Sequence, residues 1–196
     1  MKVYISGGCK NGKSSYAERL SQNIKKADTP LYYLATMIPK DEEDKERIKR
    51  HQQDREGCGF ETVEVGCDII VAIGKCDKHG TFLLDSVTAL LANEMFNTNN
   101  GDISGFSINT DAYKKITSDL TEIISKLSNI IIISDYIYSD AFLYDDLTEA
   151  YRRGLAHIDK QIARLCDVVL EFCYGNVIIH KGTENEAADQ VTLLSS

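Results

Sequence analysis

The sequence lacks three features that define common classes of protein. No apolar run approaches the roughly 20 residues that a membrane-spanning helix needs, and no cluster of lysines and arginines is free of acidic residues. The six cysteines form no Cys-x-x-Cys pair. With a formal net charge of -8, the chain lacks the basic surface with which proteins bind nucleic-acid phosphates. We therefore expect neither membrane insertion nor a nucleic-acid partner.

The sequence gives little support for a zinc site or for a secretory signal. Cys76 and His79 have ligand-like spacing but no second pair of ligands. Small buried thiols in a reducing cytoplasm explain the cysteines better. The apolar part of residues 1–6 is too short for a secretory signal, and the segment is typical of a first strand. A cytoplasmic protein is expected.

Length and composition indicate one globular domain. The 196 residues are 43% hydrophobic and 27% charged, which is ordinary for a soluble domain that buries a sizeable core. Neither a repeat nor a linker divides the chain. We expect a single domain over residues 1–182 and a polar tail over residues 183–196.

Strand-like and helix-like segments alternate along the chain. Continuous apolar runs are typical of strands that are buried on both faces of a parallel sheet, and apolar residues three and four apart indicate helices. This alternation predicts an α/β, three-layer fold with a mostly parallel sheet. The expected strands are 3–6, 31–35, 81–84, 130–134 and 168–172, and the expected helices are 14–26, 41–56, 86–96, 111–127 and 146–165.

Two further segments stand out from this pattern. Residues 172–179 contain two short strands around a Gly175-Asn176 turn, which predicts an antiparallel C-terminal hairpin. Residues 97–110 are rich in asparagine and predict a surface loop, the segment that we expect to be most mobile.

The most specific motif is the run GGCKNGKS at residues 7–14, which matches the P-loop pattern G-x-x-x-x-G-K-[ST]. It lies between the first expected strand and the first expected helix, where backbone N–H groups and the positive end of the helix bind phosphate. Lys13 reaches the β and γ oxygens in such loops, and Ser14 holds Mg²⁺. The alternative is a glycine-rich turn with a chance lysine, but the complete match and its flanks favour a P-loop NTPase-like fold.

Asp85 ends the apolar strand 81–84, as the acidic residue of a Walker B segment does. A carboxylate there meets the metal held by Ser14. The alternative is that Asp85 caps the following helix, since Ser86 begins a helical pattern. The P-loop upstream favours the metal role.

The expected helix 41–56 carries charged residues where a surface helix normally has an apolar stripe. Arg47, His51, Asp54 and Arg55 are three or four residues apart and are predicted to share one side. Arginines there would neutralise a polyphosphate, and a neutral imidazole can attack phosphorus. The alternative is a solvated helix with an incidental histidine.

A series of motifs in the first half of the chain resembles the adenosylcobinamide kinase / adenosylcobinamide-phosphate guanylyltransferase family of cobalamin assembly. The order of the motifs is more specific than any one of them. They are the P-loop at 7–14, Tyr33-Leu34-Ala35-Thr36, Asp41-x-Glu43, Arg47-Ile48-x-x-His51-x-x-x-Arg55, Phe60-Glu61-Thr62-Val63-Glu64, and Leu83-Leu84-Asp85-Ser86-Val87-Thr88 with Asn93.

The resemblance implies a function for the histidine of the polar helix. His51 matches the family's catalytic nucleophile, which takes GMP from GTP and passes it to adenosylcobinamide phosphate. The family also phosphorylates the aminopropanol hydroxyl of adenosylcobinamide, uses GTP, ATP and Mg²⁺, and forms homotrimers. Ser14 and Asp85 match the positions that contact the metal. The positions implied in nucleotide binding are Gly7, Gly8, Cys9, Lys10, Asn11, Gly12, Lys13, Ser14, Ala35, Thr36, Met37, Gln52, Gln53, Asp54, Arg55, Glu64 and Asp85.

The chain departs from the family pattern after the expected strand 130–134. Residues 134–138 are SDYIY where the family has Asn-Glu-Val-Gly. Tyr136 and Tyr138 are interpreted either as packing residues or as altered substrate contacts. Guanylyl transfer through His51 is the activity that the motifs favour. Two other hypotheses are a different small-molecule P-loop kinase and a non-catalytic nucleotide-binding regulatory protein.

Overall fold

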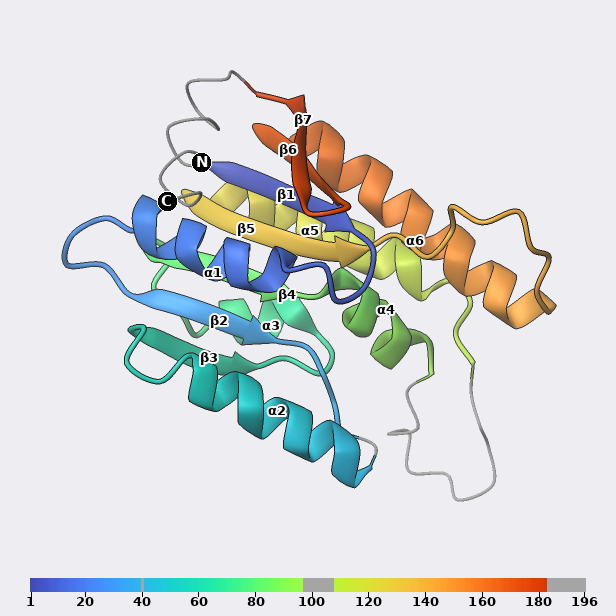
Figure 1. Cartoon of the computed structure of the whole chain (residues 1–196), viewed down its shortest axis with the longest axis horizontal. Helices are drawn as coiled ribbons and strands as arrows, with labels where there is room; N and C mark the ends of the chain where they lie inside the picture. The colour runs from blue at the N-terminus through green and yellow to red at the C-terminus, as the bar shows by residue number, and fades with distance from the viewer. Residues whose placement is uncertain (40, 97–107, 183–196) are drawn as a thin grey trace.

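The computed structural model describes residues 1–39, 41–96 and 108–182 (Figure 1). The predicted polar tail, and most of the predicted surface loop at 97–110, lie outside the described residues. No described helix is long and apolar enough to cross a membrane.

The described strands form one seven-stranded sheet in the order β3-β2-β4-β5-β1-β6-β7. Strands β1 to β6 are parallel, and β7 pairs antiparallel with β6 at the edge. The mostly parallel α/β sheet with a C-terminal hairpin was predicted and is confirmed. The strands are β1 (Lys2–Gly7), β2 (Leu31–Ala35), β3 (Phe60–Glu64), β4 (Thr81–Asp85), β5 (Asn129–Asp135), β6 (Val168–Cys173) and β7 (Asn176–Lys181).

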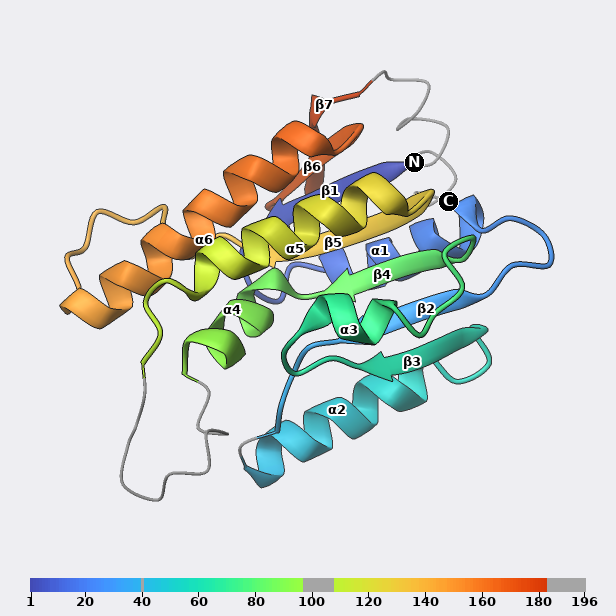
Figure 2. The same cartoon turned by 180° about the vertical axis from the view of Figure 1, so that it is seen from behind.

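Helices cover both faces of the sheet. Helix α1 packs on one face, α3 to α6 pack on the other, and α2 runs along the outer side of the edge strand β3 (Figures 1 and 2). The sheet and the helices on its two faces make three layers, as the alternation of elements predicts. The helices are α1 (Lys13–Ile24), α2 (Glu42–Asp54), α3 (Ile69–Ile73), α4 (Val87–Met95), α5 (Ala112–Lys126) and α6 (Asp146–Leu165).

Successive residues of the central strands face opposite layers. In β1, Val3 and Ile5 contact the core beneath α1, whereas Tyr4 contacts the larger core beneath α4, α5 and α6. In β5, Ile130 to Ile133 are all at most 1% exposed. Burial on both faces explains why these strands are continuous apolar runs in the sequence.

Two elements, β3 and α3, were not predicted. Strand β3 is an edge strand whose side chains are half-buried or exposed, so it lacks an apolar run. Helix α3 has five residues, too few to show a helical period. The hairpin turn is also one residue earlier than predicted: Tyr174 and Gly175 have φ values of 50° and 78°, as a two-residue turn of this kind requires, and β7 begins at Asn176.

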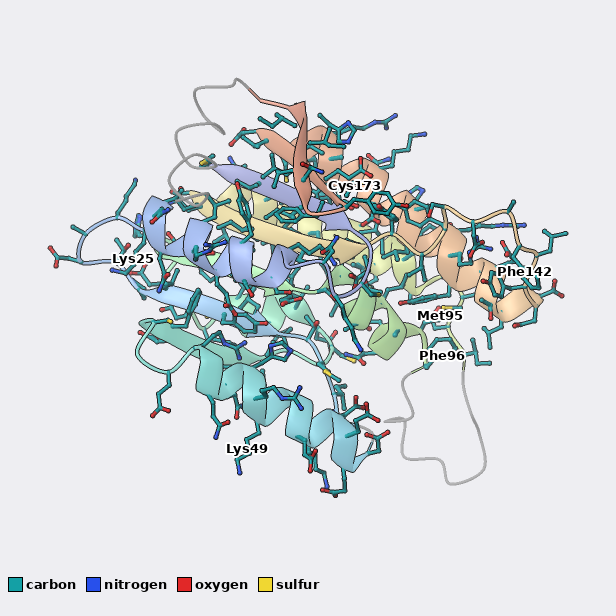
Figure 3. All side chains as sticks on the ribbon, in the orientation of Figure 1. Lys25, Lys49, Met95, Phe96, Phe142 and Cys173 are labelled. Atoms are coloured by element: carbon teal, nitrogen blue, oxygen red, sulfur yellow. The ribbon has the colours of Figure 1, made fainter. Side chains whose placement is uncertain are left out.

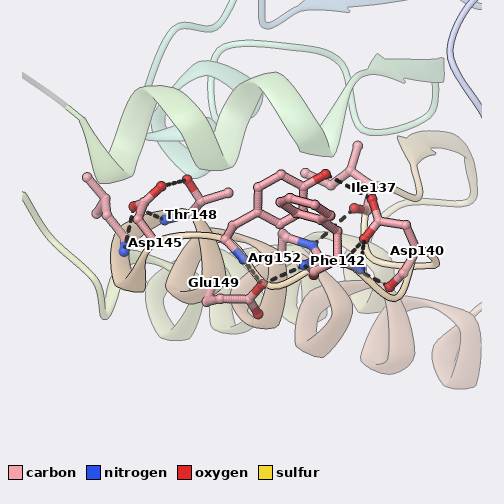
Figure 4. A network of polar contacts seen from close by, with 9 residues as sticks. Ile137, Asp140, Phe142, Asp145, Thr148, Glu149 and Arg152 are labelled. Carbon is pink, nitrogen blue, oxygen red and sulfur yellow. Dashed lines mark hydrogen bonds and ion pairs between the residues drawn. The ribbon is translucent and has the colours of Figure 1, made fainter.

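The segment between β5 and α6 has no regular secondary structure but is tied to α6 by one arginine (Figure 4). Arg152 is 7% exposed, and its guanidinium donates to the carbonyls of Ile137 at 3.2 Å and Phe142 at 3.1 Å. It also pairs with Asp140 at 2.7 Å and Glu149 at 2.5 Å. A planar group with five donors can hold several loop carbonyls at once, so this segment has a defined path.

Candidate active site

Residues 7–14 form a loop between β1 and α1, which we call the phosphate loop. A Cβ on Gly7 would lie 2.5 Å from Asn11 Nδ2 and 2.8 Å from the Phe172 carbonyl oxygen, closer than side chains pack in folded proteins. Gly12 has a φ of 88°, in the left-handed region that favours glycine. Both glycines of the motif are therefore required by the backbone of the loop.

Asn11 ties the phosphate loop to the neighbouring strand β6. Its side-chain amide donates to the Phe172 carbonyl at 3.0 Å, and its Oδ1 accepts from Lys13 N at 3.3 Å. The motif treats position 11 as variable, so its positioning role was not visible in the sequence.

Helix α1 points its N-terminus at the phosphate loop. The capping residue is Gly12, and no side chain caps the helix. The first N–H groups of an α-helix have no intrahelical acceptor, and its N-terminus carries a partial positive charge. Ser14, the second residue of the helix, is half-buried at this end. The uncapped end fits an anionic ligand such as a phosphate.

Lys13 is 5% exposed, and its amine bonds to two groups of the protein. Nζ donates to the Gly8 carbonyl at 2.8 Å and lies 2.5 Å from Asp135 Oδ1. Asp135 ends β5 and pairs in register with Gly7, and it was not among the predicted site residues. The signal that could have found it is the same one that identified Asp85, an acid at the C-terminal end of an apolar strand.

The strand register brings three predicted site residues to one edge of the sheet. Ala35 is in register with Glu64 of β3 on one side and with Asp85 of β4 on the other. Because all three strands are parallel, their C-terminal ends meet at the edge that holds the phosphate loop (Figure 1). Ala35 and Asp85 are half-buried there, and Glu64 is exposed.

Asp85 does not cap the following helix. The N-cap of α4 is Ser86, whose hydroxyl accepts from Ala89 N at 3.3 Å. Asp85 Oδ2 instead accepts from the Tyr33 hydroxyl at 2.8 Å. The capping alternative is wrong, and the Asp85 carboxylate stays at the edge of the sheet.

Tyr33 connects Asp85 to the end of α2. Burial, and next the Asp85 carboxylate, raise the pKa of Tyr33, so its hydroxyl remains a hydrogen-bond donor. The Arg55 guanidinium lies 3.6 Å from the centre of the Tyr33 ring, a cation–π contact. Arg55 is 7% exposed and lies 3.6 Å from Glu18 of α1.

Thr36 supports the site and does not line its surface. It is fully buried, its hydroxyl accepts from Ser86 N at 2.7 Å, and its carbonyl accepts from Asn93 at 2.7 Å. These bonds hold the turn that follows Asp85. Its neighbours Ala35 and Met37 are half-buried.

His51 lies on α2, apart from the phosphate loop. Its side chain is exposed, as are those of Gln52 and Gln53, and it makes no hydrogen bond within the described part of the chain. Strand β3, which α2 flanks, is four strand positions from β1, roughly 19 Å in the plane of the sheet. Within the described residues, neither a hydrogen bond nor an ion pair joins His51 to the phosphate loop.

The predicted charged side of α2 is confirmed only in part. The helix forms as expected, but the side chains of Arg47 and Asp54 lie outside the described residues. Arg55 follows the last helical residue, is buried against Tyr33, and does not share the exposed side with His51. A helical wheel fails at this position because the helix has already ended.

A cavity of about 600 Å³ lies between the end of α2 and β3. It brings together three residues that the resemblance places in the nucleotide site, and it adds an aromatic ring. The lining residues are Lys49, Gln52, Gln53, Arg55, Glu56, Gly57, Gly59, Phe60 and Thr62.

The described residues contain no group of three or more histidine, cysteine, aspartate or glutamate side chains that could hold a metal. All six cysteines are free. The expectation of small buried thiols is correct only for Cys166, since Cys9 of the phosphate loop is exposed.

The glycine loop, its lysine and the acids at the strand ends define a P-loop nucleotide-binding protein. The family model described as cobinamide kinase / cobinamide phosphate guanyltransferase matches residues 3–179, and the chain belongs to this family. It is therefore a transferase of cobalamin assembly, with the kinase and guanylyltransferase activities that define the family.

Solved structures with a similar fold have low sequence identity to this chain. An ATPase domain of known structure is 12% identical, with a TM-score of 0.50 over 92% of this chain and 76% of that one. The flagellar accessory protein FlaH from Methanocaldococcus jannaschii is 15% identical, with a TM-score of 0.49 over 92% of this chain and 78% of that one. At 12% identity the likeness to the ATPase domain extends to the fold alone. No curated protein sequence matches the chain.

Proposed function

We propose that this chain transfers GMP from GTP to cobinamide phosphate through a covalent GMP–His51 intermediate, and that it also phosphorylates cobinamide with ATP or GTP. The observation that carries the proposal is the family match over residues 3–179, which includes both the phosphate loop and His51. We further propose that the protein acts in the cytoplasm as a homotrimer.

In the first half-reaction a neutral nitrogen of His51 attacks the α-phosphorus of GTP. The bond between the α-phosphorus and the bridging oxygen breaks, and pyrophosphate leaves with the electron pair. In the second, a phosphate oxygen of cobinamide phosphate attacks the same phosphorus and releases the imidazole. Lys13 and the N–H groups at the start of α1 bind the triphosphate of GTP in the first half-reaction.

Mg²⁺ fits the residues at the edge of the sheet. The Ser14 hydroxyl and the Asp85 carboxylate are oxygen donors, which Mg²⁺ prefers, and substrate phosphates supply further ligands in sites of this class. When bound, the ion would neutralise charge on the phosphates. Tyr33 holds the Asp85 carboxylate in place through the hydrogen bond at 2.8 Å.

Helix α2 flanks β3, whereas the phosphate loop follows β1, so we propose that α2 moves in the reaction. None of the described α2 side chains is buried, so its displacement breaks little packing. The chain after α2 contains Gly57 and Gly59, with φ values of 80° and 77°, and glycines of this kind absorb backbone rotation. We propose that α2 closes over the bound nucleotide and carries His51 to the α-phosphate.

Arg55 supports a nucleotide site at this end of α2. Its Nε and Nη1 are buried without a hydrogen-bond acceptor among the described residues, and the contact to Glu18 at 3.6 Å is an ion pair only. Buried N–H groups that lack acceptors are costly, by about 1–3 kcal/mol. A nucleotide oxygen in the adjoining cavity would satisfy them.

Labelling with GTP tests the proposed intermediate. Incubation with α-³²P-GTP should leave acid-labile, base-stable label on the wild-type protein and none on His51→Ala. The variant should bind GTP with nearly wild-type affinity, because the phosphate loop is intact. His79→Ala, which removes another exposed histidine, is the matched control and should label normally. Full labelling of His51→Ala would refute the intermediate, and γ-phosphate transfer without any label would favour a simple P-loop kinase.

A further inference from the structure

Tyr33 contacts two residues of opposite charge that belong to different parts of the molecule. Its hydroxyl donates to Asp85 Oδ2 at 2.8 Å, and the Arg55 guanidinium lies 3.6 Å from the centre of its ring. Asp85 is the last residue of β4, whereas Arg55 directly follows the last residue of α2. One side chain therefore lies between the proposed metal ligand and the end of the helix that carries His51.

These contacts lie where little water reaches them. Tyr33 and Arg55 are 6% and 7% exposed, and Asp85 is half-buried. Burial, and next the Asp85 carboxylate, raise the pKa of Tyr33, whereas Arg55 lowers it, so both charges act on the same hydroxyl. Electrostatic interactions are stronger in such surroundings than in water, and neighbouring hydrogen bonds polarise one another.

The charge on Asp85 strengthens the contact between Arg55 and the Tyr33 ring. A phenol that donates to a carboxylate carries more negative charge on its ring than a free phenol does. A cation–π contact is the attraction of a cation to the negative face of a ring. Neutralising Asp85 should therefore weaken the contact that holds Arg55.

The contact between Tyr33 and Arg55 is the part of the α2 attachment that this charge can change. The turn after the helix is also held by Gln22 Nε2, which donates to the Cys58 carbonyl at 3.0 Å, but that bond joins two uncharged groups. Glu18 lies 3.6 Å from Arg55 Nη1 and is a second anionic partner of the guanidinium. We therefore expect a partial release of the helix end.

We propose that Tyr33 is a positioning residue that couples the charge on Asp85 to the position of α2. While Asp85 keeps its full negative charge, Tyr33 holds Arg55 and with it the C-terminal end of the helix. A divalent cation that binds Asp85 together with substrate phosphates neutralises this charge and loosens the helix. The inference rests on the proposed movement of α2 and gives it an order, in which the cation and the phosphates bind first and the helix closes second.

Hydrogen exchange over residues 42–54 of the full chain, without any ligand, tests the coupling. Asp85→Asn removes the charge and keeps the shape of the side chain, and Tyr33→Phe removes the hydroxyl and keeps the stacked ring. Each change should make exchange about threefold faster, and the double variant should exchange no faster than either single variant, because both changes act through one contact. Glu61→Gln, which removes an exposed acid from the neighbouring strand β3, is the matched control and should exchange like the wild type.

The role of the cation is tested with Mg²⁺ and inorganic triphosphate, which has no base to occupy the cavity beside α2. This pair should make exchange over residues 42–54 about threefold faster in the wild type, and triphosphate with EDTA should not. In Asp85→Asn and in Tyr33→Phe the pair should add nothing. Strands β1 and β5 should keep their protection in every variant, which shows that the sheet is folded.

Three results would overturn the coupling: wild-type exchange in Asp85→Asn, equal acceleration in Glu61→Gln, or multiplied effects in the double variant. Unchanged exchange of the wild type with Mg²⁺ and triphosphate would overturn the release by a cation. Absence of α-³²P label on the wild type would instead refute the proposed guanylyl transfer, and the exchange measurements do not depend on that result.

Discussion

Lys13 and Asp135 form the closest contact between the phosphate loop and the rest of the sheet. The two charged groups are 2.5 Å apart, and the exposed fractions of their side chains are 5% and 22%. A charge-assisted bond in so little solvent stabilises this conformation of the loop. A triphosphate that binds Lys13 must compete with this carboxylate.

Asp135→Asn should therefore increase nucleotide affinity. The amide keeps the size of the side chain but removes the charge that competes with phosphate, so Kd for GTP should fall about three- to tenfold. Isothermal titration calorimetry measures this. Asp111→Asn removes an exposed ion pair with Lys114 on α5 and should leave Kd unchanged. A weaker affinity in Asp135→Asn would mean that the carboxylate assists binding.

Asp159 is a buried acid on α6 whose pKa is raised to about 6, chiefly because burial disfavours its charged form. The unfolded chain binds fewer protons at this group than the native protein does between about pH 4 and pH 6. Stability from this residue is therefore highest at low pH and declines as pH rises through the folded pKa.

Asp159→Asn should remove this pH dependence. Between about pH 5 and pH 7 the wild-type free energy of unfolding should fall by about 1 kcal/mol more than that of the variant. Urea denaturation at the two pH values measures the difference. Asp146→Asn, which alters an acid in the first turn of the same helix, is the control. Parallel pH profiles for wild type and Asp159→Asn would show that the acid titrates normally.

At the scale of elements, α2 is the least anchored helix. Asp41 caps it by accepting from Asp44 N at 2.8 Å, and acids in its first turn favour the helix dipole, so local sequence stabilises it. Its attachment to the body is at its C-terminal end, where Arg55 stacks on Tyr33. An element held mainly at one end is suited to a hinged movement.

Arg55→Ala should release α2 without unfolding the sheet. Hydrogen exchange over residues 42–54 should become about tenfold faster, while β2 and β4 keep their protection. Arg50→Ala, which removes an exposed arginine from the same helix, should have no such effect. Unchanged exchange in Arg55→Ala would show that other contacts hold the helix.

At the scale of the whole molecule, an apolar group is exposed at one end. Phe142, Leu143 and Tyr144 are 67%, 86% and 42% exposed, and Phe142 lies at the tip of the molecule beside the start of α6 (Figure 3). Clustered apolar side chains on a surface often mark a contact with another protein. We therefore place the subunit contact of the proposed homotrimer at this tip.

Leu143→Glu should shift the protein from trimer to monomer, because a charge would be buried in the subunit contact. Analytical ultracentrifugation measures the mass, and Val71→Glu, at a residue of α3 that is 58% exposed, is the control. A monomeric wild type would contradict the trimer itself. A trimeric Leu143→Glu would place the subunit contact elsewhere.

The sequence by itself determined the features that depend on neighbouring residues. The eight residues of the P-loop, the buried parallel strands and the long helices were all predicted, because hydrophobic period and loop chemistry are local properties. The edge strand β3 and the short helix α3 were not predicted, since β3 lacks an apolar run and α3 has too few residues to show a helical period.

The tertiary structure decided which distant residues meet. It placed Asp135 against Lys13 across 122 positions of the chain, joined Arg55 to Asp85 through Tyr33, and formed a cavity between Tyr136 and β6. It also placed His51 on α2, which runs along the edge strand β3. These contacts depend on the order in which strands pair, and the same apolar pattern is compatible with several strand orders.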